Sequence, residues 1–172
     1  MNDSQYQILT TRAEQLVKER IIGHRKGLPD MPNFIHSFRV AELLKKYRSN
    51  ETVQLAGLLH DIVEDGGMTF EELVGLGFPE EVLDLVRLCT HDMSVSQKDL
   101  RWILMLIKLV RADSTNAWVI KLADVFDNIQ DAHALSEERE KFMREVKIPV
   151  LLSASEHLLG TSEIWRGLKG EI

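Results

Sequence analysis

The spacing of apolar residues predicts helices along nearly the whole chain. Apolar side chains recur at intervals of three and four, and no stretch alternates in the manner of a convincing strand. Residues 23–32 combine glycine, proline and charge, which predicts a loop. The expected helices cover about residues 4–22, 50–65, 69–77, 79–89, 96–111, 115–132 and 136–159, with a further helix from about residue 33. We therefore expect an all-α protein, a single domain over residues 1–172 built as a bundle of eight or nine helices.

Residues 55–65 form the most unusual segment, because an apolar helix there ends in ionisable side chains. His60 and Asp61 come first, and Glu64 and Asp65 follow one turn later. At helical spacing His60 and Glu64 share one face, as do Asp61 and Asp65. Burying ionised carboxylates costs several kcal/mol each unless a cation or hydrogen bonds compensate. The cluster therefore predicts a bound metal ion.

Two more polar residues lie on helices that are otherwise apolar. Taken alone, His36 is most simply a core histidine bonded to the backbone, and Asp124 a buried partner of Lys121 or Arg111. Together with His60 and Asp61, however, they make a set of two histidines and two aspartates. Such a mixed set suits a first-row divalent ion, and composition leaves manganese, iron, nickel, cobalt and zinc open.

Composition narrows the partners and the compartment. The net charge is −6 and no run of Lys or Arg exceeds two residues, which argues against duplex nucleic acid as the main partner. Neither a signal-peptide core nor an apolar run long enough for a membrane span is evident. The single cysteine, Cys89, cannot form an internal disulfide. We expect a soluble, cytoplasmic protein.

The order of these polar residues resembles the HD superfamily of metal-dependent phosphohydrolases, an all-helical fold. Within it, the pattern is most similar to the RelA/SpoT-type guanosine tetraphosphate hydrolase domains and their small stand-alone versions. The resemblance covers about residues 21–128. The matching motifs are Arg25-Lys26, Pro32-Asn33-Phe34-Ile35-His36, His60-Asp61-Ile62-Val63-Glu64-Asp65-Gly66 and Lys121-Leu122-Ala123-Asp124-Val125-Phe126-Asp127-Asn128.

This resemblance implies a cofactor, a substrate class and a set of site residues. The cofactor is one divalent metal ion, with Mn²⁺ ranked first and Fe, Co, Ni or Zn as alternatives, and the partner is a small phosphorylated nucleotide. The implied metal ligands are His36, His60, Asp61 and Asp124; the acidic pair that orients or activates the attacking water is Glu64 and Asp65; the implied substrate-binding residues are Arg25, Lys26, Lys121 and Asn128. Lys121 could instead pair with a nearby carboxylate.

Four departures from the family pattern affect the substrate more than the reaction. Asn33 replaces a tyrosine, Ser37 a proline and Gly66 a threonine, and His91 replaces the lysine that commonly follows the threonine at position 90. A 3′-pyrophosphate hydrolase of a guanosine tetraphosphate-like nucleotide ranks first. A nucleoside 5′-monophosphatase, another nucleotide hydrolase and a non-catalytic nucleotide sensor remain alternatives, and a homo-oligomer is possible.

Other polar residues carry weaker expectations. His91-Asp92 repeats the histidine–aspartate dipeptide without further ligands, so we do not expect a second metal site there. His24 could add to a substrate pocket. The mixed-charge run 137–147 is typical of a solvated helix face.

Overall fold

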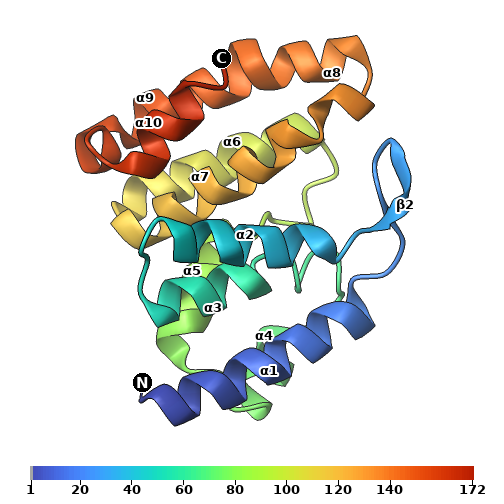
Figure 1. The fold of residues 1–172 in the computed structure, drawn as a ribbon, viewed down its shortest axis with the longest axis vertical. Helices are drawn as coiled ribbons and strands as arrows, with labels where there is room; N and C mark the ends of the chain where they lie inside the picture. The colour runs from blue at the N-terminus through green and yellow to red at the C-terminus, as the bar shows by residue number, and fades with distance from the viewer. Residues whose placement is uncertain (1) are drawn as a thin grey trace.

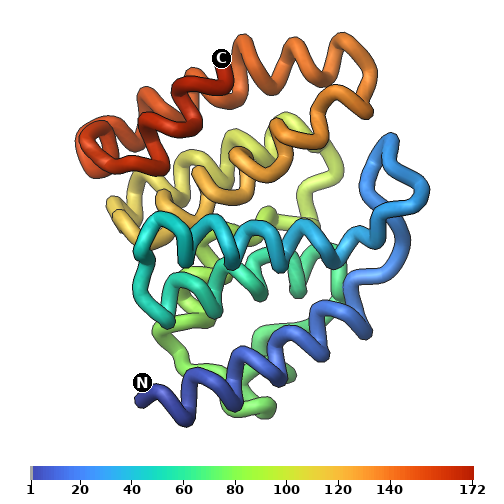
Figure 2. The backbone as a smooth tube through the Cα atoms, viewed as in Figure 1, coloured from blue at the N-terminus to red at the C-terminus, as the bar shows by residue number. Residues whose placement is uncertain are grey.

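Residues 2–172 are described in the computed structural model, and they fold into helices with one small hairpin (Figures 1 and 2). The elements are α1 (Asp3–Arg20), β1 (His24–Arg25), β2 (Leu28–Pro32), α2 (Ile35–Lys46), α3 (Glu51–Leu59), α4 (Phe70–Gly75), α5 (Glu80–Cys89), α6 (Lys98–Ala112), α7 (Thr115–Gln130), the 3₁₀ helix η1 (Ala132–Ala134), α8 (Glu137–Phe142), the π-helix η2 (Met143–Lys147), α9 (Ile148–Leu159) and α10 (Glu163–Lys169).

The all-α prediction is confirmed. Because α8, η2 and α9 follow one another without a break, the described residues contain nine α-helical segments when this run counts as one. None of the helices in this part of the chain is both long and apolar enough to cross a membrane. Thr69 and Glu72 form the predicted capping box at the start of α4.

Helix α7 lies at the centre of the bundle and explains why polar residues can be held inside. It packs against α2, α3, α5, α9 and α10, while α1 and the C-terminal helices lie on opposite sides (Figure 1). Trp118 on α7 is completely buried. Lys121, Asp124 and Asp127 of the same helix are also buried, so each needs a polar partner inside the protein.

The prediction of a loop without strands over residues 23–32 is wrong. β1 and β2 pair in antiparallel fashion around a tight turn. Gly27 in that turn has φ +77°, and a side chain there would meet the carbonyl oxygen of Ala134 at 1.9 Å. So short a hairpin carries no apolar alternation that a sequence pattern could reveal. It brings the Arg25-Lys26 pair close to the end of α7.

The third helix is shorter than predicted. α3 ends at Leu59, and residues 60–66 form successive turns instead of continuing to Asp65. The amide of Ile62 donates to the carbonyl of Leu59, a 3₁₀-type bond that tightens the chain. His60 and Glu64 therefore do not share the face that a regular helix would give them.

Candidate metal centre

His36, His60, Asp61 and Asp124 meet at one point, although they come from three separate segments of the chain. His36 Nε2 lies 3.2 Å from Asp124 Oδ1 and 3.6 Å from Asp61 Oδ2. His60 Nε2 lies 3.2 Å from Asp61 Oδ2 and 4.0 Å from Asp124 Oδ1. Ligands that each stand about 2.1 Å from one ion are separated by about 3.0–3.4 Å in tetrahedral or octahedral geometry. His36, His60 and Asp124 thus offer ligand atoms that all lie within 4.8 Å of one another, and Asp61 Oδ2 lies beside both histidines as a candidate fourth ligand.

The second nitrogen of each imidazole is held by a protein acceptor. His36 Nδ1 donates to Asp127 Oδ2 at 2.6 Å, and His60 Nδ1 donates to the carbonyl oxygen of Gly57 at 2.7 Å. This arrangement turns both Nε2 atoms toward the aspartates. His60 Nε2 is buried and has no hydrogen-bond partner among the described residues. A buried nitrogen fixed in this way suits a metal ligand, because metal-binding histidines usually donate their other ring N–H to a carboxylate or carbonyl.

The charges of the cluster shift the pKa values of its members in the directions expected for mutual attraction. Burial opposes a charge on His36, but hydrogen bonds with Asp124 and Asp127 outweigh it and raise the pKa to about 9. Burial likewise opposes a charge on Asp124, but Lys121 and His36 hold the pKa of that carboxyl well below its usual value. His60 and His36 lower the pKa of Asp61 despite its burial. Both carboxylates are therefore ionised at neutral pH.

Asp124 is the residue to which most of the site connects. Lys121 Nζ lies 2.6 Å from Asp124 Oδ2, and Asn128 donates its side-chain amide to Oδ1. The alternative expectation for Lys121, a pair with a nearby carboxylate, matches this contact. Lys121 neutralises one of the two aspartates, and its ammonium is engaged by Asp124 instead of pointing at a substrate.

A chain of ion pairs behind the cluster holds its geometry. Arg39 Nε lies 2.6 Å from Asp127 Oδ1, and Arg39 also binds Asp131. Arg25 Nε donates to Asp131 at 3.1 Å, and its terminal nitrogen donates to Asn128 at 3.0 Å. These contacts connect His36 through Asp127, Arg39 and Asp131 to Arg25 of the hairpin. From Arg25 they lead through Asn128 back to Asp124. Arg39, Asp127 and Asp131 were not predicted as site residues, although the spacing of Asp127 and Asp131 from Asp124 places them near one helical face.

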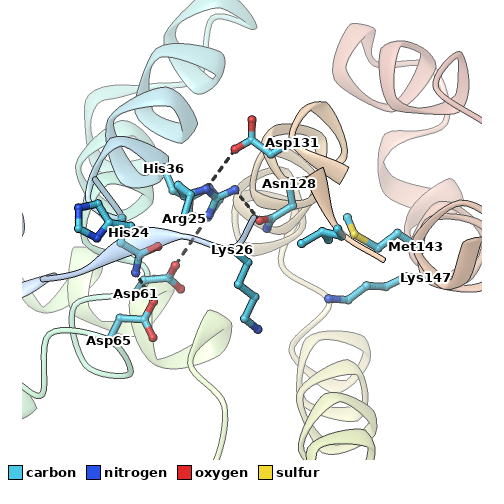
Figure 3. Close-up of a pocket in the computed structure, with 12 residues that line it drawn as sticks. His24, Arg25, Lys26, His36, Asp61, Asp65, Asn128, Asp131, Met143 and Lys147 are labelled. Atoms are coloured by element: carbon cyan, nitrogen blue, oxygen red, sulfur yellow. Dashed lines mark hydrogen bonds and ion pairs between the residues drawn. The ribbon is translucent and has the colours of Figure 1, made fainter. Parts of the chain in front are cut away.

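A hollow of about 420 Å³ opens beside the four candidate metal ligands (Figure 3). This size falls in the range of small-molecule sites. His24 borders it as well, as the sequence suggested. The predicted site residues that line it are Arg25, Lys26, His36, Asp61, Asp65 and Asn128, and Asn33, Asp131 and Lys147 add further polar groups.

The structure separates the two predicted acidic residues. Asp65 lines the hollow and accepts a hydrogen bond from Asn33 at 3.3 Å. Burial and the neighbouring charge of Asp61 raise the pKa of Asp65. Glu64 instead accepts bonds from the backbone amide and Nδ1 of His91, at 2.6 and 3.0 Å. Of these two residues Asp65 therefore lines the hollow, and His91 is the partner of Glu64.

Comparison with known proteins points to the same kind of site. Residues 33–129, more than half of the chain, match the HD domain family. A probable guanosine-3′,5′-bis(diphosphate) 3′-pyrophosphohydrolase of Mycoplasma pneumoniae is 36% identical over 131 residues, covering 70% of this chain and 18% of that protein. The Drosophila melanogaster pyrophosphohydrolase MESH1 is 35% identical over 109 residues, covering 62% of this chain and 59% of that protein. The chain thus spans less than two thirds of these relatives.

The fold agrees with a solved relative over almost its whole length. A metazoan ortholog of SpoT that hydrolyses ppGpp superimposes on this chain with a TM-score of 0.76 at 27% identity. The aligned region covers 99% of this chain and 95% of the ortholog's chain. The Xenopus tropicalis MESH1 pyrophosphohydrolase is 29% identical over 165 residues, 94% of this chain and 86% of that protein. The resemblance seen in the motifs is confirmed, and the chain belongs to the HD domain family.

Proposed function

We propose that this protein is a metal-dependent phosphohydrolase that removes the 3′-pyrophosphate of guanosine-3′,5′-bis(diphosphate). The observation that best supports this function is that His36, His60, Asp61 and Asp124 lie together beside a polar hollow. Relatives that share the fold or the motifs carry this activity in their names. The overall reaction breaks the bond between the ribose 3′-oxygen and phosphorus. The oxygen of water ends in pyrophosphate, and the ribose oxygen gains a proton.

The four residues of the cluster would hold one divalent ion, for which we propose Mn²⁺. When bound, such an ion polarises phosphoryl oxygens and lowers the pKa of water. Lys121 keeps Asp124 ionised, and Asp127 keeps the Nε2 atom of His36 turned inward. These contacts orient the ligands before any substrate enters.

Asp65 is our candidate for the residue that accepts the proton of the attacking water. It borders the hollow close to Asp61, and its raised pKa moves it toward the range in which a carboxylate works as a general base. Glu64, bound to His91, supports the turn that carries Asp65. The family resemblance gave both residues the role of orienting or activating the attacking water. We assign the proton transfer to Asp65 and a supporting role to Glu64.

The cationic and amide groups of the hollow support a phosphorylated nucleotide as the ligand. Lys26 is exposed in the hairpin turn and its side chain enters the hollow. Arg25 and Asn128 line the same wall but are bonded to one another, so they present their remaining N–H groups in fixed directions. We place the protein in the cytoplasm, in keeping with its single buried, unpaired Cys89.

A nucleotide panel tests the proposed function. The protein is incubated with Mn²⁺ and guanosine-3′,5′-bis(diphosphate), GMP, GDP or GTP, and pyrophosphate and phosphate release are followed. We expect pyrophosphate release from the bis(diphosphate) alone, with kcat on the order of 1–10³ s⁻¹. Phosphate release from GMP would favour the 5′-monophosphatase alternative. A complex with the bis(diphosphate) that stays intact for hours with Mn²⁺ present would favour a sensor.

A further inference from the structure

A second hollow of about 380 Å³ adjoins the first, and Lys26 and Lys147 line both of them. Figure 3 shows the two lysine side chains reaching from the hairpin and from the C-terminal helices into the same space. Beyond them, the second hollow is bordered by Lys98, Arg101, Trp102 and Phe142, with Glu64 and Asp99 as its carboxylates. The two lysines thus stand where the two hollows meet.

Lys147 presents an unpaired ammonium where the two hollows meet. It is half-buried, and no hydrogen bond or ion pair joins its ammonium to residues 2–172. Burial, together with the positive charges of Lys121 and Lys26, lowers the pKa of Lys147. A cation that is partly removed from water is stabilised by a paired carboxylate or a bound anion. Lys121 and Lys26 disfavour its charge, and the carboxylates of Asp124 and Asp61 oppose them without pairing with its ammonium, so a bound anion would supply the missing direct partner.

The backbone around Lys147 explains how a residue in a run predicted to be solvated comes to face the site. Residues Met143–Lys147 form a π-helix, in which the amide of Ile148 donates to the carbonyl of Met143, five residues earlier. Pro149 follows after Ile148, and in a regular α-helix a proline ring collides with the carbonyl four residues before it, here that of Glu145. The wider π turn accommodates the proline, and Lys147, the last residue of that turn, lines both hollows. Such single π turns are frequent at functional sites.

We propose that Lys147 is a phosphate-binding residue, and that with Lys26 it clasps the phosphate groups of the nucleotide that are not cleaved. This inference rests on the proposed function, because it places the scissile phosphate at the metal cluster. The ligand would then extend from the first hollow into the second. Lysine suits this role, since its compact ammonium presents three donors that turn freely toward phosphate oxygens.

The test is a calorimetric titration of the metal-free protein with GDP and, separately, with uncharged guanosine. The variant Lys147→Met keeps the length of the side chain and removes its charge, and Lys147→Arg retains the charge. Loss of one charge-assisted bond should weaken GDP binding about tenfold in Lys147→Met. Guanosine binding should be unchanged, and Lys147→Arg should restore most of the GDP affinity.

Lys141→Met is the matched control, because Lys141 lies six residues earlier in the same helical run, is 66% exposed and pairs with the exposed Glu145. It should bind GDP as the wild type does. Equal GDP affinity in Lys147→Met and wild type would overturn the proposal, as would a wild type that binds no GDP or an equal loss of guanosine and GDP binding.

The two proposals fail in different ways. A wild type that binds GDP through Lys147 but cleaves no bis(diphosphate) would contradict the proposed function and leave the role of Lys147 intact. A wild type that cleaves the bis(diphosphate), with Lys147→Met unchanged in both GDP affinity and KM, would contradict only the role of Lys147.

Discussion

Replacing Asp124 by alanine is expected to reduce hydrolysis of guanosine-3′,5′-bis(diphosphate) by at least about 10³-fold, because the cluster loses a ligand and an ionised carboxylate. The same change leaves Lys121 buried without its partner, which costs about 3–5 kcal/mol of stability. Initial rates with Mn²⁺, measured at a temperature where the variant is still folded by circular dichroism, separate the two effects.

Two further variants make the Asp124 experiment specific. The double variant Lys121→Met with Asp124→Ala removes the unpaired ammonium, so it should regain thermal stability while remaining inactive. Asp84→Ala removes an exposed carboxylate on α5. It should change the rate of hydrolysis by less than about twofold and leave the thermal stability close to that of the wild type. Activity within tenfold of wild type in a folded Asp124→Ala protein would contradict the assigned site.

The metal-free protein is expected to lose stability between about pH 6.5 and 9. The folded-state pKa of His36 is about 9, above its ordinary 6.5, so the stabilisation by its charged form is complete below pH 6.5 and disappears as pH rises through 9. The full effect is on the order of 3 kcal/mol at most. Urea unfolding in EDTA at a series of pH values measures it.

Manganese should reverse this trend. Ligation needs an unprotonated His36, so each bound ion displaces a proton below pH 9 and the apparent Mn²⁺ affinity should rise with pH, by up to about tenfold per unit from 7 to 9. His36→Gln should remove the His36 part of both slopes. A metal-free stability that stays flat or rises over this range, relative to His36→Gln, would contradict the charge assignment of the cluster.

The all-helical fold and the metal cluster could be predicted from the sequence because their signals are local. The apolar spacing that marks the helices also identifies His36 and Asp124 as polar residues on apolar faces. The cost of burying such groups unpaired is large enough to imply a common partner. Their meeting in space, at 3.2 Å, agrees with that expectation.

The remaining features depend on contacts between distant segments. Because the chain forms turns after Leu59, the side chains of Glu64 and Asp65 have different surroundings. Glu64 binds His91, which lies 27 residues later in the sequence. The hairpin has too few residues for an apolar alternation. Lys147 belongs to a mixed-charge run in which the chain forms a π turn before Pro149, and there it lines both hollows. Regular helical geometry predicts a solvent-facing position for residues in such a run.

Anomalous diffraction from crystals grown with saturating Mn²⁺ tests whether His36, His60, Asp61 and Asp124 hold one metal ion. We expect one strong peak about 2.0–2.3 Å from Nε2 of His36 and of His60 and from carboxylate oxygens of Asp61 and Asp124. The absence of a peak among these four residues, or a peak only at an unrelated surface position, would contradict it.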